Sequence, residues 1–197
     1  MSRRRQRDAQ HAARRTEIFR SLGLVLRERG LGSLSMREIA SRLGMTKGNL
    51  YYYFQDKQDL LYQCHVRCMR LSLAALREIG AGPDPPGVRL HRLLTRHIRA
   101  ITDEVYGAVI LTDLESLTPT QRRRYIAMRD RFERGVRALI RDGVAQGEFR
   151  KVDPRVAGFA MLGAINWIPK WYDPQGALSA AAIAEAFADL FIAALEA

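Results

Sequence analysis

Residues 35–54 read SMREIASRLGMTKGNLYYYF, and this stretch decides the fold of the N-terminal part of the chain. Its first apolar residues recur at the i, i+3, i+4 and i+7 spacing of one helical face: Met36, Ile39, Ala40 and Leu43. Ser35 is a good N-cap, and Glu38, three residues later, completes a capping box. Gly44 stands where helices often end with a residue in the left-handed region. We therefore expect a short helix between Ser35 and Gly44.

A second short helix follows after the turn. Thr46 is its expected N-cap, and Leu50 and Phe54 form its expected buried side. Two helices joined by a tight glycine-containing turn make a helix-turn-helix, whose second helix enters the DNA major groove. Its first turn, residues 46–49 (TKGN), contains no acidic residue that would repel DNA. An ordinary helix pair with packed tyrosines is the alternative interpretation.

Three tyrosines and the start of the next helix extend this surface. Consecutive residues point in different directions around a helix, so at least one side chain in the run 51–53 (YYY) must be exposed and able to donate to a phosphate. Asp56 is the expected cap of the following helix, and Lys57 lies in its first turn. Free N–H groups and the positive dipole at a helix start favour a phosphate contact there.

Residues 14–62 resemble the DNA-binding region of the TetR family of bacterial repressors. The resemblance depends on the approach at Leu31–Ser35, on residues 36–40 (MREIA), 43–45 (LGM) and 46–54 (TKGNLYYYF), and on Lys57 and Leu60–Leu61 after them. It implies DNA contacts from the following residues: Ser35, Arg37, Thr46, Lys47, Asn49, Tyr51, Tyr52 and Lys57. It also implies a pseudo-palindromic operator that is bound by a homodimer.

Charge is concentrated at this end of the 197-residue chain. The net charge is +11, and residues 1–60 carry 13 Lys and Arg against 6 Asp and Glu. Such a bias is typical of a protein that binds a polyphosphate. Residues 1–15 hold six arginines and one aspartate, which indicates a flexible basic arm. The arm is either a solvated tail or a minor-groove contact.

The remainder also has helical periodicity, so we expect an all-α chain of about nine helices. The expected domains are the arm at 1–15, the three-helix DNA-binding domain at 16–57, and an effector-binding and dimerisation domain at 58–197. A long helix from Asp56 to about Ile79 connects the two domains, and the Gly- and Pro-rich run 80–87 ends it. The apolar segment 156–168 and the helix after Ser179 have more apolar surface than one chain covers. We expect them to form the dimer, although they could instead close the core of a monomer.

No enzyme, cofactor or metal site is expected. Cys64, His65 and Cys68 offer too few ligands for zinc, and buried small side chains explain the cysteines better. Acidic pairs such as Asp103–Glu104 do not face each other on a helix, and no phosphate-binding loop or nucleophile motif is present. With no disulfide framework, signal peptide or long apolar segment, we expect a cytoplasmic protein without a membrane span.

The effector is expected to be hydrophobic. Residues 164–172 (AINWIPKWY), 117–124 (LTPTQRRR) and 141–150 (RDGVAQGEFR) resemble the branch of the family that responds to acyl-CoA thioesters and controls lipid catabolism. We expect the effector pocket to be lined by Ile110, Leu114, Phe132, Phe159, Asn166, Trp167 and Trp171. The tryptophans could instead be core or dimer contacts. An amphipathic drug, as in efflux regulation, is the alternative effector. A helical acyl-thioester scaffold without DNA binding is the alternative of a different class.

Overall fold

The computed structural model describes residues 13–19, 21, 35–104 and 114–196, and the regular elements of these residues are all helices. After a helical segment at 13–19 come α2 (Met36–Arg42), α3 (Lys47–Tyr53), α4 (Lys57–Ile79), α5 (Pro86–Arg99), α6 (Pro119–Ala145), α7 (Pro154–Trp171) and α8 (Ala180–Leu195). A π-helical turn, η1 (Ala100–Glu104), extends α5, and η2 (Leu114–Ser116) is a single 3₁₀ turn. The all-α prediction is confirmed. The described residues contain eight α-helical segments, against about nine helices expected for the whole chain.

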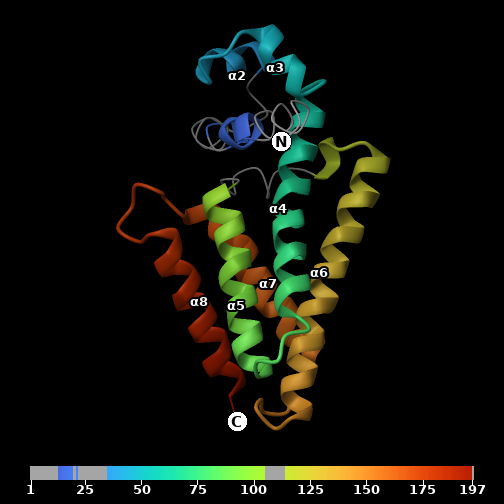
Figure 1. Cartoon of the computed structure of the whole chain (residues 1–197), viewed down its shortest axis with the longest axis vertical. Helices are drawn as coiled ribbons and strands as arrows, with labels where there is room; N and C mark the ends of the chain where they lie inside the picture. Colours follow the sequence, from blue (N-terminus) through green and yellow to red (C-terminus); the bar gives the residue numbers. More distant parts are fainter. Residues whose placement is uncertain (1–12, 20, 22–34, 105–113, 197) are drawn as a thin grey trace, which may run out of the picture.

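The helices form a small reading head and a larger body. Figure 1 shows α2 and α3 at one end of the molecule, with α4 running from that end into the group formed by α5 to α8. The C-terminus lies at the far end of the body. Helix α4 has 23 residues and therefore spans about 34 Å at 1.5 Å per residue. Among the described helices, α4 is the one that lies partly in the reading head and partly in the body.

Local capping shapes the reading head as the sequence predicts. The Glu38 amide donates to Ser35 Oγ at 3.2 Å, and the Ser35 amide donates to Glu38 Oε2 at 2.8 Å, so the capping box is formed. Gly44 has a φ of 62°, in the left-handed region that a residue with a Cβ rarely adopts. The Asn49 amide donates to Thr46 Oγ1 at 3.2 Å, which starts α3 at the predicted residue.

Aromatic and aliphatic packing fixes the head onto α4. Leu50 and Phe54 of the α3 region and Leu60 of α4 are each at most 1% exposed. The rings of Phe19 and Phe54 meet edge to face, with 5.5 Å between their centroids. Removing such side chains from water stabilises the contact by about 1.5–3 kcal/mol each. A tilt of α4 must therefore move the head with it.

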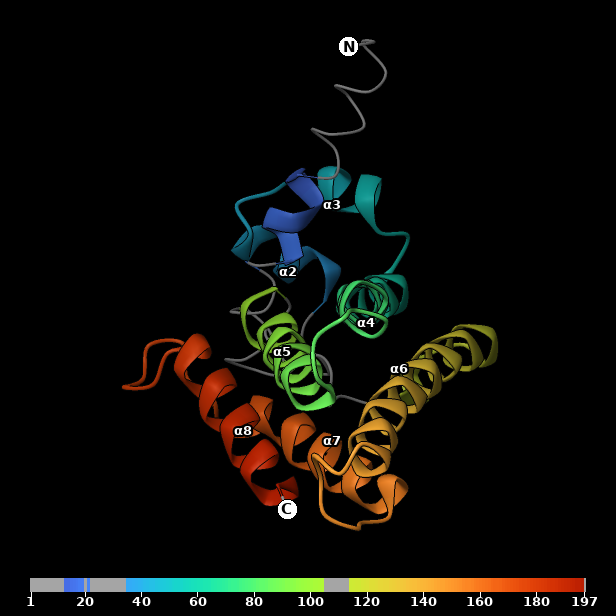
Figure 2. The same cartoon turned by 60° about the horizontal axis from the view of Figure 1, so that its bottom comes forward.

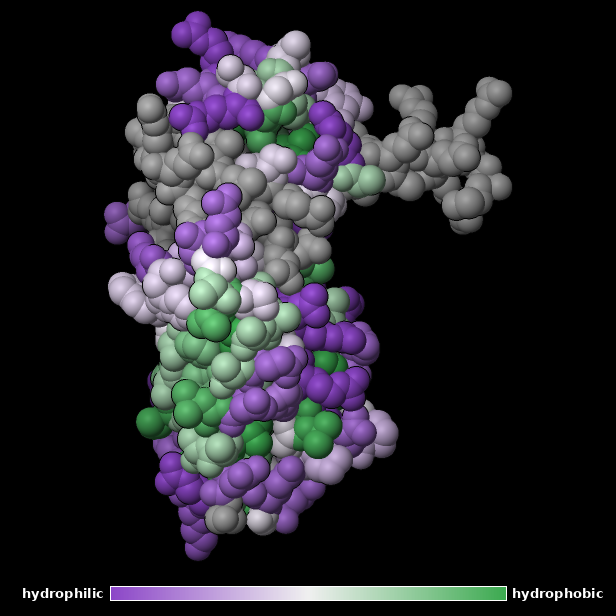
Figure 3. All heavy atoms as spheres, turned by 90° about the vertical axis from the view of Figure 1, so that its left-hand side faces the viewer, coloured by the Kyte–Doolittle hydropathy of each residue, from purple (hydrophilic) through white to green (hydrophobic). Residues whose placement is uncertain are grey.

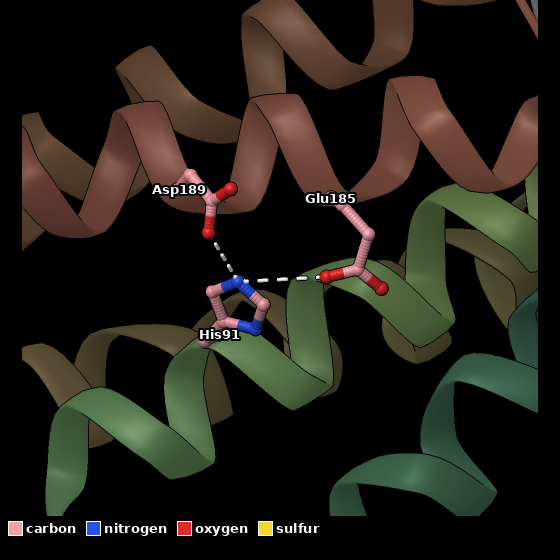
Figure 4. Close-up of polar contacts among 3 residues, drawn as sticks. All are labelled: His91, Glu185 and Asp189. Carbon is pink, nitrogen blue, oxygen red and sulfur yellow. Dashed lines mark hydrogen bonds and ion pairs between the residues drawn. The ribbon is translucent and has the colours of Figure 1, made fainter.

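Helix α5 is the centre of the body and packs against α4, α6 and α8. Figure 2 shows α5 with α4 and α8 on different sides of it. Its apolar stripe, Leu90, Leu93, Leu94 and Ile98, is fully buried. At the edge of the α5–α8 contact, His91 Nε2 lies 2.9 Å from Asp189 Oδ1 and 3.7 Å from Glu185 Oε2 (Figure 4). The two carboxylates are one helical turn apart on α8, so both reach the same imidazole.

The last two helices keep an uncovered apolar surface. Gly158, Met161, Ile165 and Ile168 form the buried side of α7. The other side of α7, the segment between the two helices and α8 expose large apolar residues, and we call this surface the α7–α8 face: Val156, Phe159, Trp167, Trp171, Leu178 and Leu190. Figure 3 shows green, apolar side chains gathered on the lower part of the side that α8 occupies in Figure 1. Val156 and Trp167 are 65% and 61% exposed, so α7 has more apolar surface than the single chain covers, as the sequence predicts.

Candidate nucleic-acid interface and effector cavity

The first turn of α3 is open to solvent while its opposite side is buried. Thr46, Lys47 and Asn49 are exposed, and Leu50 is fully buried against the rest of the head. Side chains at the N-terminal end of a recognition helix are those that reach base edges in the major groove. The geometry therefore leaves this turn available for DNA. Gly48 also lies here, and a Cβ at that position would meet nothing within 4 Å.

The three consecutive tyrosines of α3 differ in their exposure, as expected for adjacent residues on a helix. Tyr51 is 41% exposed and Tyr52 is 69% exposed, whereas Tyr53 is half-buried. The Lys47 ammonium lies 5.5 Å from the centroid of the Tyr51 ring, a cation–π distance. The expectation of at least one exposed tyrosine is confirmed. These phenols and the Lys47 ammonium are groups that can donate to phosphate oxygens.

The remaining predicted contacts flank α3. Arg37 is exposed on α2, and Ser35 is exposed but its hydroxyl donates to Glu38 Oε2 at 2.6 Å. Lys57 is half-buried in the first turn of α4. The Asp56 carboxylate already accepts the Asp59 amide at 2.7 Å, so the start of α4 carries its own anion. Because the helix end is capped in this way, the Lys57 ammonium rather than the backbone N–H groups is the predicted phosphate contact there. All eight predicted residues lie on α2, α3 and the start of α4, at one end of the molecule (Figure 1).

A cavity of about 310 Å³ lies in the body between α4, α5, α6 and α7. We call it the effector cavity, and its lining residues are Met69, His97, Arg129, Asp130, Phe132, Glu133, Phe159, Leu162, Gly163 and Asn166. Three predicted pocket residues, Phe132, Phe159 and Asn166, are thus brought together from two helices. Leu114 does not line this cavity, and Ile110 lies outside the described residues.

The two tryptophans lie apart from this lining. Trp167 is 61% exposed on the α7–α8 face. Trp171 is 45% exposed, and its ring stacks on Phe187 of α8 with 6.2 Å between centroids. Within one chain, both therefore belong to the surface that is available to a partner.

His97 of α5 adds a polar group to the lining of the effector cavity. Its Nδ1 lies 2.7 Å from Ser72 Oγ, and the Ser72 hydroxyl donates to the Cys68 carbonyl at 3.1 Å. Since that hydroxyl has one proton, the imidazole must carry its proton on Nδ1 and keep Nε2 as an acceptor. Burial lowers the pKa of His97 to about 3, so the ring is neutral near pH 7. The cavity wall thus includes a neutral ring that contacts the Phe132 ring at a tilt of 38°, with 4.4 Å between centroids.

Neither a metal centre nor a reactive thiol is found in the part of the chain that the structure describes. Its His, Cys, Asp and Glu residues form no group of three that could hold an ion. Cys64 and Cys68 are buried free thiols, as predicted. Burial raises the pKa of Cys68 to about 12 and raises that of Cys64 further above its ordinary value, so both remain protonated thiols.

A helix-turn-helix whose capped second helix is exposed at one end of the molecule places the chain in the class of helix-turn-helix DNA-binding proteins. Residues 25–64 match the sequence model for bacterial regulatory proteins of the tetR family. Residues 83–195 match the model for a tetracyclin repressor-like C-terminal domain. The chain belongs to the TetR family: it is a non-enzymatic, DNA-binding transcriptional repressor. Within the described residues, no helix combines the length and the apolarity needed to cross a membrane.

Individual relatives agree with this assignment over nearly the whole chain. The TetR family transcriptional regulator PfmR from Thermus thermophilus has 34% identity and a TM-score of 0.79, with 91% of this chain and 99% of that one covered. AibR in complex with isovaleryl coenzyme A and operator DNA has 29% identity and a TM-score of 0.71, with 91% and 96% covered. The transcriptional repressor KstR2 of Rhodococcus jostii (strain RHA1) is 26% identical over 186 residues, which cover 92% of this chain and 90% of that protein.

Proposed function

We propose that two copies of this chain join through their α7–α8 faces and bind a pseudo-palindromic operator as a homodimer. The exposed apolar residues of α7 and α8 support this pairing, since contiguous apolar surface on a soluble domain marks an interaction site. A two-fold axis at this face would set two copies of α3 at a fixed separation. Recognition helices of such dimers read half-sites about 34–36 Å apart, so a shift of a few ångströms disrupts the fit.

The effector cavity is the feature that supports ligand release. Met69 of α4 lines it, and the other end of α4 holds the reading head through Leu60 and Phe54. A ligand that needs more room beside Met69 favours another tilt of α4 and hence another spacing of the heads. An effector shifts the equilibrium only by its difference in affinity for the two arrangements, typically ~1–3 kcal/mol.

The proposed effector is a long-chain acyl-CoA, and the proposed regulated process is lipid catabolism. Met69, Phe132, Phe159 and Leu162 give the cavity apolar walls that suit an acyl chain. AibR was crystallised in complex with isovaleryl coenzyme A and operator DNA, which supports an acyl-CoA effector for this chain. His97 Nε2 would accept a hydrogen bond from an amide or hydroxyl of the bound effector.

One observation favours a second effector class, a cationic amphiphile of the kind exported by efflux systems. The apolar segments near 108–111 and 156–168 contain no carboxylate, but α6 brings Asp130 and Glu133 to the cavity. Glu133 is paired with Arg137 at 2.8 Å, and Arg129 lies next to Asp130 in the lining. Because the Arg137 guanidinium offsets the Glu133 charge and Arg129 adds a cation to the lining, we prefer the acyl thioester.

The test of DNA binding is a mobility shift with the duplex upstream of the protein's own gene. We expect a shift whose affinity falls steeply with salt, as counterion release requires. Lys47→Ala combined with Tyr52→Ala should abolish the shift while dimerisation is kept. Arg122→Ala, an exposed arginine of α6, is the matched control and should leave the shift intact. Unaltered binding by the Lys47/Tyr52 variant would overturn the assignment of the interface.

Effector identity is tested in the same assay. Long-chain acyl-CoA should release the duplex at micromolar concentration, whereas a cationic amphiphile such as a quaternary ammonium dye should not. Release by the dye alone would favour the second effector class. Tighter DNA binding in the presence of acyl-CoA would keep the site and reverse the direction of the switch.

A further inference from the structure

A second cavity, of about 440 Å³, lies between α6 and the start of α7 and is dominated by arginine. We call it the basic groove, and its lining residues are Arg134, Arg137, Ala138, Arg141, Asp153, Pro154 and Arg155. The α6 arginines are three, four and seven residues apart, so they share one side of that helix. Four arginines therefore line one depression whose lining contains a single carboxylate.

The protein's own acids neutralise only part of this charge. Arg137 pairs with Glu133 at 2.8 Å, and Arg141 lies 4.0 Å from Asp142 with its side chain 70% exposed, a weak pair. Among the described residues, no ion pair involves Arg134.

The Asp153 carboxylate in this lining is already hydrogen-bonded to backbone amides of α7. Asp153 Oδ1 accepts the amides of Arg155 at 2.7 Å and Val156 at 3.3 Å, so it caps the helix. The Arg155 guanidinium lies over the Phe159 ring, 5.6 Å from its centroid. None of the described ion pairs joins the Arg155 guanidinium to a carboxylate. The groove therefore keeps a net positive charge, which favours an anionic ligand with several acceptor oxygens.

Two side-chain contacts connect the basic groove to the effector cavity. Glu133 lines the effector cavity, and its partner Arg137 lines the groove. Phe159 likewise lines the effector cavity, and the Arg155 guanidinium above its ring lines the groove. The two depressions are thus neighbouring sections along the α6–α7 contact, one mainly apolar and the other basic.

The separation of the two sections sets the length of a ligand that would occupy both. Phe132 and Arg141 are nine residues apart on α6, which is about 13 Å at 1.5 Å per residue. An extended chain of about four amide-linked units covers that distance. A ligand with an apolar chain at one end, an amide-linked arm and phosphates at the other end fits this layout.

We propose that the basic groove binds the phosphate groups of the same effector whose acyl chain occupies the effector cavity. This inference rests on the proposed function and assigns the polyanionic half of the effector to Arg134, Arg137, Arg141 and Arg155. Guanidinium groups bind phosphate oxygens through paired N–H donors, which gives orientation as well as affinity. The groove therefore selects acyl thioesters of a phosphorylated carrier over free fatty acids.

The experiment is a calorimetric titration of the full-length protein with two ligands. Lauroyl-CoA carries the phosphates, and S-lauroyl-pantetheine has the same acyl chain and arm without them. The test variant is Arg134→Ala with Arg155→Ala, and the matched control is Arg122→Ala with Arg124→Ala at the exposed start of α6. Arg141→Ala, at a largely exposed position, is a second and milder variant in case the double variant is unstable.

We expect the test variant to bind lauroyl-CoA 10- to 100-fold more weakly and S-lauroyl-pantetheine within twofold of the wild type. Equal losses for the two ligands, no loss, or the same loss in the control would overturn the phosphate assignment alone. A wild-type protein that binds neither ligand would overturn the proposed effector class as well, and DNA binding measured in parallel would be unaffected by that result.

Discussion

The α7–α8 face gives the sharpest quantitative prediction, through Leu190→Ala. Leu190 is 63% exposed in the single chain, so a partner that covers it removes most of its side chain from water. Full burial of a leucine is worth about 1.5–3 kcal/mol, which leaves roughly 1–2 kcal/mol per chain for this position. A two-fold dimer contains the residue twice, so the loss is roughly 2–4 kcal/mol. At about 1.4 kcal/mol per factor of ten, the dimer dissociation constant should rise roughly 30- to 1000-fold.

Sedimentation velocity over a range of protein concentrations measures this constant. Ile126→Ala is the matched control, because Ile126 is an exposed aliphatic residue on α6, outside the α7–α8 face. It should leave dimerisation unchanged, and the thermal unfolding of diluted Leu190→Ala should resemble that of diluted wild type. A wild-type protein that sediments as a single chain at micromolar concentration would refute the reasoning. So would equal dissociation constants for the two variants.

Three further outcomes are expected. Gly48→Ala should stabilise the free protein by about 0.5–1 kcal/mol, because the new Cβ meets nothing within 4 Å. It should also weaken operator binding, because the added methyl group lies on the side of α3 that faces the duplex. Melting curves and mobility shifts test the two effects, and tighter DNA binding would contradict the second. His97 has a pKa of about 3 in the folded chain against an ordinary 6.5. As the pH falls from 6.5 to 3, the unfolded chain therefore binds a proton at His97 and the folded chain does not. Stability should drop there by about 1.4 kcal/mol per pH unit more in wild type than in His97→Gln, and urea titrations in which both proteins lose the same stability between pH 7 and pH 5 would refute it. Asn166→Ala, in the lining of the effector cavity, should lower the acyl-CoA response more than DNA affinity, and an unchanged ligand response would remove Asn166 from the effector site.

Local sequence was sufficient for the reading head. The Ser35–Glu38 box, the left-handed Gly44 and the Thr46 cap each involve residues within a few positions of one another, so their geometry follows from backbone chemistry. The same holds for α4, which begins after Asp56 and ends at Ile79 as predicted. Exposure of at least one tyrosine followed from helical periodicity alone.

Tertiary packing decided the effector cavity and the α7–α8 face. Met69, His97, Phe132 and Asn166 come from four helices, and no local pattern states which of their sides meet. Sequence reasoning named Phe132 and Asn166 but passed over Met69 and His97, which look like ordinary members of apolar stripes. It also grouped Trp167 with the pocket, although its side chain lies on the outer side of α7. A helix determines its own apolar stripe by residue spacing, whereas the choice of neighbour depends on how all the helices fill the common volume.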